Sequence, residues 1–327
     1  MTPMPLLDFL RALLKGFAQV FFMNNALTGL FFLIAIGVAC QASGDWGPFW
    51  GSLVGGASAT LTALVIDRAK DPLHTGMYGF NGVLLGVALP TFLQGDGLMW
   101  GLIVLGAAMT TIIVDALSNV LTKTWDVAVS TGPFVLTTWL LLFSVAAFDG
   151  LHFIAPVSDT LAVPQAARWA DLDALLALQV TLRNISQVFL LNNAWSGLLI
   201  LLGVAVASRG GALAAWLGAL LALVCATVLG ADRQTVQSGL YGFSAVLSAM
   251  AVAVVFIEPS PRSALVGGLA VVFTVIIQGA LNHWLAPYGV PSLTAAYLIA
   301  MWLFTLPKMD LLIHPHQPNR SSSFGRN

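Results

Sequence analysis

Three kinds of polar residue recur in this apolar sequence at a spacing that could serve a small solute: glutamine, paired asparagine and threonine. The stretch Gln19–Ala26 returns 168 residues later as Gln187–Ala194, and Thr131 is followed 163 residues later by Thr294. Amide and hydroxyl oxygens accept hydrogen bonds from N–H groups. Neither repeated stretch contains a carboxylate, which a bare cation would need as a partner. The pattern therefore favours an uncharged molecule with several N–H donors.

The same order of phrases runs through both halves of the chain. Gly-Met-Tyr-Gly-Phe-Asn at 76–81 corresponds to Gly-Leu-Tyr-Gly-Phe-Ser at 239–244, and Trp139 corresponds to Trp302, again 163 residues apart. Landmarks that recur in one order at a nearly constant offset indicate an internal duplication.

The composition is that of a membrane protein. Of the 327 residues, 58% are hydrophobic and 8% are charged, against about 25% charged residues in a typical soluble domain. Such a chain cannot cover its surface with polar groups in water. The net charge of −1 leaves no basic face for nucleic acid. Cys40 and Cys225 stand in apolar runs, and we expect them to be small buried side chains.

The apolar runs predict five spans in each half, since a crossing needs about 20 apolar residues. The predicted spans are 28–41, 49–66, 76–93, 98–117 and 129–148, then 196–208, 211–230, 239–257, 264–281 and 290–306. A shorter segment that ends in paired asparagines precedes each set. These two segments predict re-entrant half-helices at about 17–25 and about 183–193.

The domain organisation follows from these spans. The expected parts are a first repeat at 1–149, a polar linker at 150–173, a second repeat at 174–307 and a disordered tail at 308–327. Because five is an odd number of crossings, the second repeat must insert upside down.

Charge supports that topology. With the N-terminus in the cytoplasm, ten of the 13 Lys and Arg residues fall on the cytoplasmic side, as the positive-inside rule requires. The sequence therefore predicts an all-α integral membrane protein of two inverted repeats, with both termini cytoplasmic and the linker outside.

Inverted repeats with interrupted segments place a solute path at the repeat interface, near the bilayer midplane. A half-helix that stops inside the membrane leaves carbonyl groups without intrahelical partners. Irregular backbone at that depth is tolerated where it is buried in protein or lines a wet cavity. Two such ends would offer rows of acceptor oxygens to a neutral solute.

The doubled Gln-Val-Phe…Asn-Asn and Tyr-Gly-Phe phrases, on this inverted ten-span plan, resemble the urea transporters (urea channels) of bacteria and animals. The resemblance runs from about residue 17 to residue 306. It implies a homotrimer with one pore per subunit and passive conduction of urea without a cofactor. It also implies a place in the plasma membrane, the inner membrane of a bacterium.

The resemblance also implies roles for particular residues. Gln19 and Gln187 would stand at the two mouths of a narrow filter and offer amide oxygen to urea N–H. The wall beside them would be formed by Val20, Phe22, Val188 and Leu190. Flat apolar slots that accept a planar molecule and exclude hydrated ions would be formed by Phe80, Leu84, Phe243 and Leu247. Thr131 and Thr294 would supply hydroxyl groups in the middle, where the halves meet.

Two departures from the family pattern are visible. Some members carry Glu at one mouth, whereas both positions are Gln here, so the charge-assisted contact to urea is absent. The second copy reads Phe-Ser-Ala at 243–245 where the first reads Phe-Asn-Gly at 80–82, so the two slots need not be equal.

Each role has a structural alternative. Paired asparagines can simply cap helices, and apolar residues four apart can be helix-packing residues. A membrane threonine often bonds its own i−4 carbonyl, and a glutamine can bond a neighbouring helix. Most of the tryptophans are expected at span ends as interfacial anchors.

Asp115 is the one acid expected inside a span, and its counterpart in the second half is Gln278. An intramembrane acid can be a proton relay. Without a second titratable group in register, a structural hydrogen-bond acceptor or an interfacial position is favoured.

The function that these patterns predict is passive, urea-selective transport. The alternative in transport is a facilitator for another small polar solute, such as a short amide or ammonia. A membrane enzyme is the alternative from another class, but no His/Cys/Asp cluster with metal-ligand spacing falls inside the predicted spans. A scaffold without transport would leave the duplicated interrupted segments unexplained.

Overall fold

The computed structural model describes residues 4–68, 70–154 and 165–307. Within them the chain is built from helices, and β-structure is limited to the isolated bridges Leu93–Phe153 and Ala166–Asp232. The predicted tail at 308–327 lies outside the described residues, as does the middle of the predicted linker.

The first half contains α1 (Leu6–Gln19), α2 (Ala26–Ser43), α3 (Gly47–Val65), α4 (Lys70–His74), α5 (Gly79–Phe92), α6 (Gly97–Leu117), α7 (Lys123–Trp125) and α8 (Gly132–Ser144). The second contains α9 (Ala174–Ser186), α10 (Ala194–Ala207), α11 (Arg209–Val228), α12 (Arg233–Gln237), α13 (Phe243–Met250), α14 (Pro261–Leu285) and α15 (Ala295–Thr305). A π-helical turn at Ala251–Val255 continues α13.

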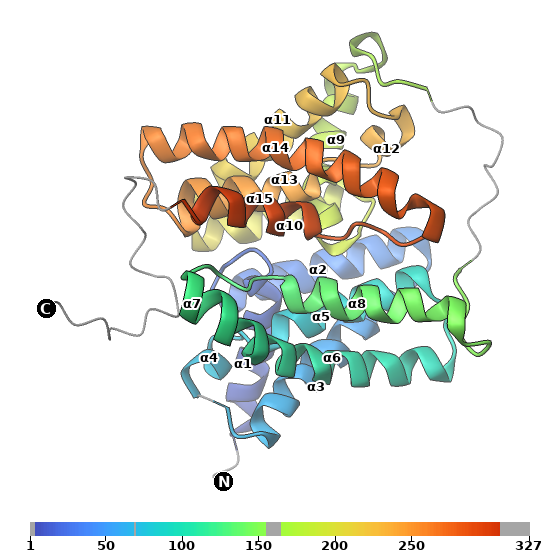
Figure 1. The fold of residues 1–327 in the computed structure, drawn as a ribbon, viewed down its shortest axis with the longest axis vertical. Coiled ribbons are helices and arrows are strands. Elements are labelled where there is room, and N and C mark those ends of the chain that lie inside the picture. The colour runs from blue at the N-terminus through green and yellow to red at the C-terminus, as the bar shows by residue number, and fades with distance from the viewer. Residues whose placement is uncertain (1–3, 69, 155–164, 308–327) are drawn as a thin grey trace, which may run out of the picture.

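The two halves form two layers (Figure 1). Helices α1 to α8, coloured blue to green, form the lower layer, and α9 to α15, yellow-green to red, form the upper one. Helices α6 and α14 run in opposite directions, and so do α8 and α15.

Reciprocal hydrogen bonds join α2 to α10. The hydroxyl of Thr28 donates to the carbonyl oxygen of Gly203 at 2.7 Å, and the hydroxyl of Ser196 donates to that of Ala35 at 2.7 Å. Ser196 corresponds to Thr28 and Gly203 to Ala35, each at 168 residues. The same contact is therefore made twice, once in each direction.

Trp139 and Trp302 form a second reciprocal pair of hydrogen bonds between the halves. The indole Nε1 of Trp139 donates to the carbonyl oxygen of Pro291 at 2.8 Å, and that of Trp302 donates to Ala128 at 3.0 Å. These two tryptophans form hydrogen bonds between the halves. Most tryptophans are expected at span ends as interfacial anchors, which is a different role.

The helices of the two interrupted segments end earlier than the sequence predicts. In place of half-helices at about 17–25 and 183–193, α1 ends at Gln19 and α9 ends at Ser186, where a 3₁₀ turn follows. Phe22 and Leu190 have φ of 64° and 58°. A residue with left-handed φ and ψ turns the backbone in the opposite sense, so it cannot continue a right-handed helix.

The second asparagine of each pair starts the next helix. The Asn25 side chain accepts the N–H of Leu27 at 2.8 Å, and the Asn193 side chain accepts the N–H of Ser196 at 2.9 Å. A free N–H at a helix start is costly away from water. The predicted capping role of the asparagines is therefore what the structure shows at these two positions.

Glycine allows each interrupted segment to pack tightly on the helix that follows it. A Cβ on Gly29 would lie 1.8 Å from the carbonyl oxygen of Leu14, and one on Gly197 would lie 2.0 Å from that of Leu182. No side chain fits at either distance, so these contacts between α1 and α2, and between α9 and α10, require glycine.

Two groups of apolar helices differ in length. By length and hydropathy, four could cross a membrane, namely α2, α6 and α14 with their continuations, and α11, or five if the bent pair α9–α10 counts as one span. The apolar helices α5, α8, α13 and α15 have 10–17 residues with their 3₁₀ or π extensions. They are about 15–25 Å long, shorter than the ~30 Å hydrocarbon core.

Candidate functional site

Two cavities lie at opposite ends of α5. The first has a volume of about 470 Å³ and is lined by Met77 and Phe80 at the start of α5. The second, of about 310 Å³, is lined by Phe92 at its end. At about 30 Å³ for each water, each cavity has room for several solvent or solute molecules.

Corresponding residues of the two halves line the two cavities. Those of the first cavity are Phe22, Met77, Phe80, Ala128, Val129, Ser130 and Val255. Those of the second, in the same order, are Leu190, Leu240, Phe243, Pro291, Ser292, Leu293 and Phe92. Both cavities thus combine residues of both halves.

Helices α5 and α13 run in opposite directions between the cavities. Helix α5 begins at the first cavity and ends at the second, whereas α13 begins at the second with Phe243 and its π extension ends at the first with Val255. A helix of 14 residues is about 21 Å long, which sets the distance that a solute would have to travel.

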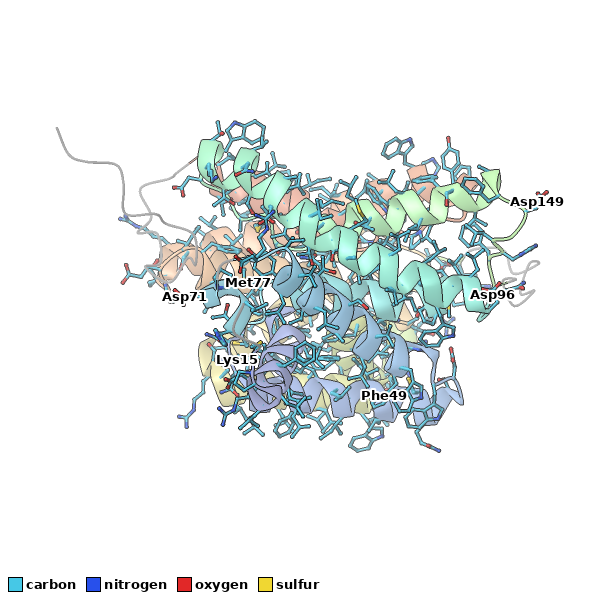
Figure 2. The ribbon with its side chains drawn as sticks, turned by 90° about the horizontal axis from the view of Figure 1, so that it is seen from below. Lys15, Phe49, Asp71, Met77, Asp96 and Asp149 are labelled. Atoms are coloured by element: carbon cyan, nitrogen blue, oxygen red, sulfur yellow. The ribbon has the colours of Figure 1, made fainter. Side chains whose placement is uncertain are left out.

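Charged residues lie at both ends of the helices (Figure 2). Lys15 and Asp71 lie at one end of the helices, and Asp96 and Asp149 lie at the other. A chain that crosses a membrane repeatedly must have its successive connections at alternate ends of the helices.

Thr131 and Thr294 meet between the cavities. Each directly follows a cavity-lining residue, Ser130 or Leu293. Their hydroxyl oxygens lie 2.7 Å apart and form one hydrogen bond. Each residue is 2% exposed, so the hydroxyl pair is buried, with a cavity-lining residue directly before each threonine.

Gln19 and Gln187 are each anchored through the side-chain amide nitrogen. The Nε2 of Gln19 donates to the carbonyl oxygen of Thr75 at 3.0 Å, and that of Gln187 donates to Ser238 at 2.8 Å. An amide held by its nitrogen keeps its oxygen as the acceptor end. Gln19 lines the first cavity, whereas Gln187 is not among the residues that line the second.

Four of the remaining candidates line a cavity, and four do not. Phe22 and Phe80 line the first cavity, and Leu190 and Phe243 line the second. The other candidates are at most 2% exposed and belong to the hydrophobic core, namely Val20, Leu84, Val188 and Leu247. Each lies within four residues of a cavity residue along the chain.

Two residues that sequence reasoning missed are Phe256, which lines the first cavity, and Asn81, which follows the lining residue Phe80. Phe256 packs edge-on against Phe22, with ring centroids 5.7 Å apart. Asn81 is fully buried, and its Oδ1 accepts the N–H of Phe134 at 3.0 Å at the start of α8. The repeated Tyr-Gly-Phe phrase ends at Asn81 and could have signalled it; nothing in the repeat points to Phe256.

Asp115 forms an ion pair outside both cavities. Its Oδ2 lies 2.6 Å from the Nε of Arg68, and the two side chains are 26% and 42% exposed. An acid that is paired and partly exposed near a helix end serves as a structural acceptor. This agrees with the structural interpretation of Asp115.

Uncharged side chains line both cavities. The polar ones are Gln19, Asn24, Thr75, Ser118, Thr122 and Ser130 in the first and Gln278, Asn282 and Ser292 in the second. The linings, as far as the described residues go, include no Asp, Glu, Lys, Arg or His. Such surfaces suit a neutral, hydrogen-bonding solute.

Known proteins resemble the chain along nearly all of its length. A family model described as "Urea transporter" matches residues 10–309, a range that contains both cavities and the threonine pair. "Urea transporter 1" of Ovis aries is 29% identical over 303 residues, which are 92% of this chain and 77% of that protein. "Urea transporter 1" of Rattus norvegicus is 28% identical over 308 residues, with the same 92% and 77%.

Proposed function

The chain belongs to the urea transporter family, and on that premise we propose that it conducts urea passively across the membrane, from one cavity to the other past Thr131 and Thr294. The observation that carries this proposal is the pair of cavities. They lie at opposite ends of α5, corresponding residues line them, and the buried hydroxyl pair directly follows a lining residue of each.

The short helices fit this role. Helices α5 and α13 line the cavities, α8 and α15 begin beside the threonine pair, and all four are too short to cross hydrocarbon alone. Irregular backbone at membrane depth is stable where it lines a wet cavity. Short helices with a cavity at each end would leave only a short dry passage for the solute.

Urea would be recognised by acceptors and flat apolar walls. The anchored amides of Gln19 and Gln187 would turn their oxygens to urea N–H, and the threonine hydroxyls would do so at the centre. The walls of the passage would come from the phenylalanines and leucines that line or adjoin the cavities, namely Phe22, Phe80, Leu84, Leu190, Phe243 and Leu247, with Val20 and Val188. A hydrated ion would lose its water there without gaining a charged partner.

Transport would be passive. Coupling to a proton gradient needs ionisable groups on the path. Both cavity linings are uncharged, and Asp115 pairs with Arg68 away from them.

The two halves would be inverted repeats, 1–149 and 174–307, joined by the linker 150–173. The opposite directions of α5 and α13 support this, and so do the reciprocal bonds of the tryptophans. Ten crossings would then place both termini in the cytoplasm. A homotrimer with one pore per subunit, in the plasma membrane or bacterial inner membrane, completes the proposal; native mass spectrometry in detergent tests the trimer.

Urea flux into proteoliposomes tests the function. Purified protein in liposomes should raise downhill uptake of labelled urea over protein-free liposomes, and an excess of a urea analogue should reduce that uptake. Liposomes that take up a short amide or ammonia rapidly but urea at the protein-free rate would favour the alternative facilitator and reject urea as the permeant.

A further inference from the structure

Two departures from the internal repeat meet each other in space. Ser130 stands where the second half has Leu293, and Tyr297 stands where the first half has Phe134, each pair 163 residues apart. The hydroxyl oxygens of Ser130 and Tyr297 lie 2.8 Å apart. The corresponding pair, Leu293 and Phe134, is apolar. One side of the threonine pair therefore has an additional hydroxyl pair that the other side lacks.

Ser130 stands at the boundary between the first cavity and the threonine pair. It lines that cavity and immediately precedes Thr131. Its φ of 48° puts it in the left-handed region, where the chain turns from the extended segment into α8. The Tyr297 ring lies behind it, fully buried, with its centroid 6.1 Å from that of Phe22.

The hydrogens of this pair can be assigned from the partners. The Tyr297 hydroxyl donates to the Sδ of Met301 at 3.0 Å. Either hydroxyl could donate in the bond between them, but a phenol has one hydrogen, and its use toward Met301 favours Ser130 as the donor. The Ser130 oxygen then has no hydrogen left for the cavity and can only accept.

We propose that Ser130 is a further solute-binding residue, an acceptor-only position for an N–H group at the inner end of the first cavity. In this proposal Tyr297 is a positioning residue that holds the Ser130 hydrogen away from the solute. The inference rests on the proposed urea conduction. It adds a binding step on one side of the threonine pair only, which the repeat by itself would not produce.

An acceptor-only position has a specificity that can be measured. Urea and thiourea carry the same N–H donors, but the sulfur of thiourea is a much weaker acceptor than the oxygen of urea. A site that only accepts should hold both molecules equally by this contact. A site that donates should favour urea.

The experiment measures half-saturating concentrations for urea and thiourea uptake into proteoliposomes. Ser130→Ala should raise both by a similar factor of about three to ten, the loss of one hydrogen bond. Tyr297→Phe frees the Ser130 hydrogen, so the preference for urea over thiourea should rise. Ser130→Gly removes the same oxygen and suits the left-handed backbone, and it replaces the alanine variant if that variant does not assemble.

Matched controls come from the same kinds of residue elsewhere. The Ser144 hydroxyl on α8 donates to its own helix, at the carbonyl of Leu141, and Tyr288 is 60% exposed. Ser144→Ala and Tyr288→Phe should leave both concentrations and their ratio unchanged.

The outcomes separate this inference from the function on which it rests. Wild-type liposomes that take up no urea would reject the proposed function. With wild-type urea uptake established, unchanged values for Ser130→Ala would overturn the inference. A loss confined to urea would also overturn it, because Ser130 would then be a donor. An unchanged urea-to-thiourea ratio in Tyr297→Phe would remove the positioning role.

Discussion

The hydroxyl oxygens of Thr131 and Thr294 lie 2.7 Å apart, although 163 residues separate them in the chain. Each is the counterpart of the other in the internal repeat. When a residue contacts its own counterpart, a two-fold relation between the halves must pass through the contact, as at an isologous dimer interface. This bond is therefore where the architecture and the proposed path coincide.

The first prediction concerns that bond. Thr131→Val and Thr294→Val each conserve shape and remove one hydroxyl acceptor, which leaves a urea N–H group short of a partner at the centre of the proposed path. An unmade buried hydrogen bond costs about 1–3 kcal/mol, so each change should slow urea flux roughly ten-fold or more. Proteoliposome flux at equal amounts of assembled protein measures this.

The control for the threonines retains the hydroxyl group. Thr131→Ser and Thr294→Ser should conduct far better than the valine variants. Wild-type flux in both valine variants would make the two threonines packing residues. The centre of the path would then be built from backbone carbonyls alone.

The second prediction concerns energy coupling. Urea uptake should be unchanged when the proton gradient or the membrane potential is collapsed, because both cavity linings are uncharged. Asp115→Asn should retain that behaviour, since Asp115 pairs with Arg68 outside the cavities. Uptake that stops when a proton ionophore is added, and that Asp115→Asn makes insensitive to the ionophore, would make Asp115 a coupling residue.

The third prediction concerns topology. In a variant with Cys40 and Cys225 replaced, a cysteine at Asp149 should react with an impermeant thiol reagent in intact cells. A cysteine at Asp71 should react only after permeabilisation. Both residues are exposed, and they lie at opposite ends of the helices. Equal labelling of the two sites in sealed cells would contradict the inverted arrangement.

The fourth prediction concerns the tight packing behind the interrupted segments. Gly29→Ala and Gly197→Ala should destabilise the protein, because the added Cβ would lie 1.8 Å and 2.0 Å from backbone oxygens. Overpacking costs about 1–3 kcal/mol, occasionally more, so thermal unfolding in detergent should begin at a lower temperature. Gly101→Ala is the control, since nothing lies within 4 Å of its Cβ position. A stability equal to that control would contradict the close approach of α1 to α2 and of α9 to α10.

The fifth prediction concerns the reciprocal tryptophans. Trp139→Phe and Trp302→Phe each remove one N–H donor to a carbonyl of the other half. Each should lower stability by about 1 kcal/mol, measured as a lower midpoint of thermal unfolding. Trp195→Phe, at a residue 71% exposed, should have no such effect. Identical midpoints for all three variants would show that the two bonds do not stabilise the interface.

The sequence by itself determined the helical membrane class and the segments in which helices are interrupted, and it predicted the duplication. These depend on composition and on local chemistry, which a chain carries wherever it folds. The asparagine caps at Asn25 and Asn193 are an example, because a cap acts within three residues. The correspondence of Thr131 with Thr294 was likewise readable from spacing.

Only the tertiary structure decided which of the candidate residues reach a cavity. Both Phe80 and Leu84 belong to the hydrophobic core, but Phe80 also lines a cavity, whereas Leu84, one helical turn further along α5, does not. The bond between Thr131 and Thr294, the contact of Phe256 with Phe22 and the pairing of Ser130 with Tyr297 also emerged there. Each joins segments that are far apart in the chain, and no local pattern encodes the distance between them. Packing of the two halves against each other sets that distance, and with it the path.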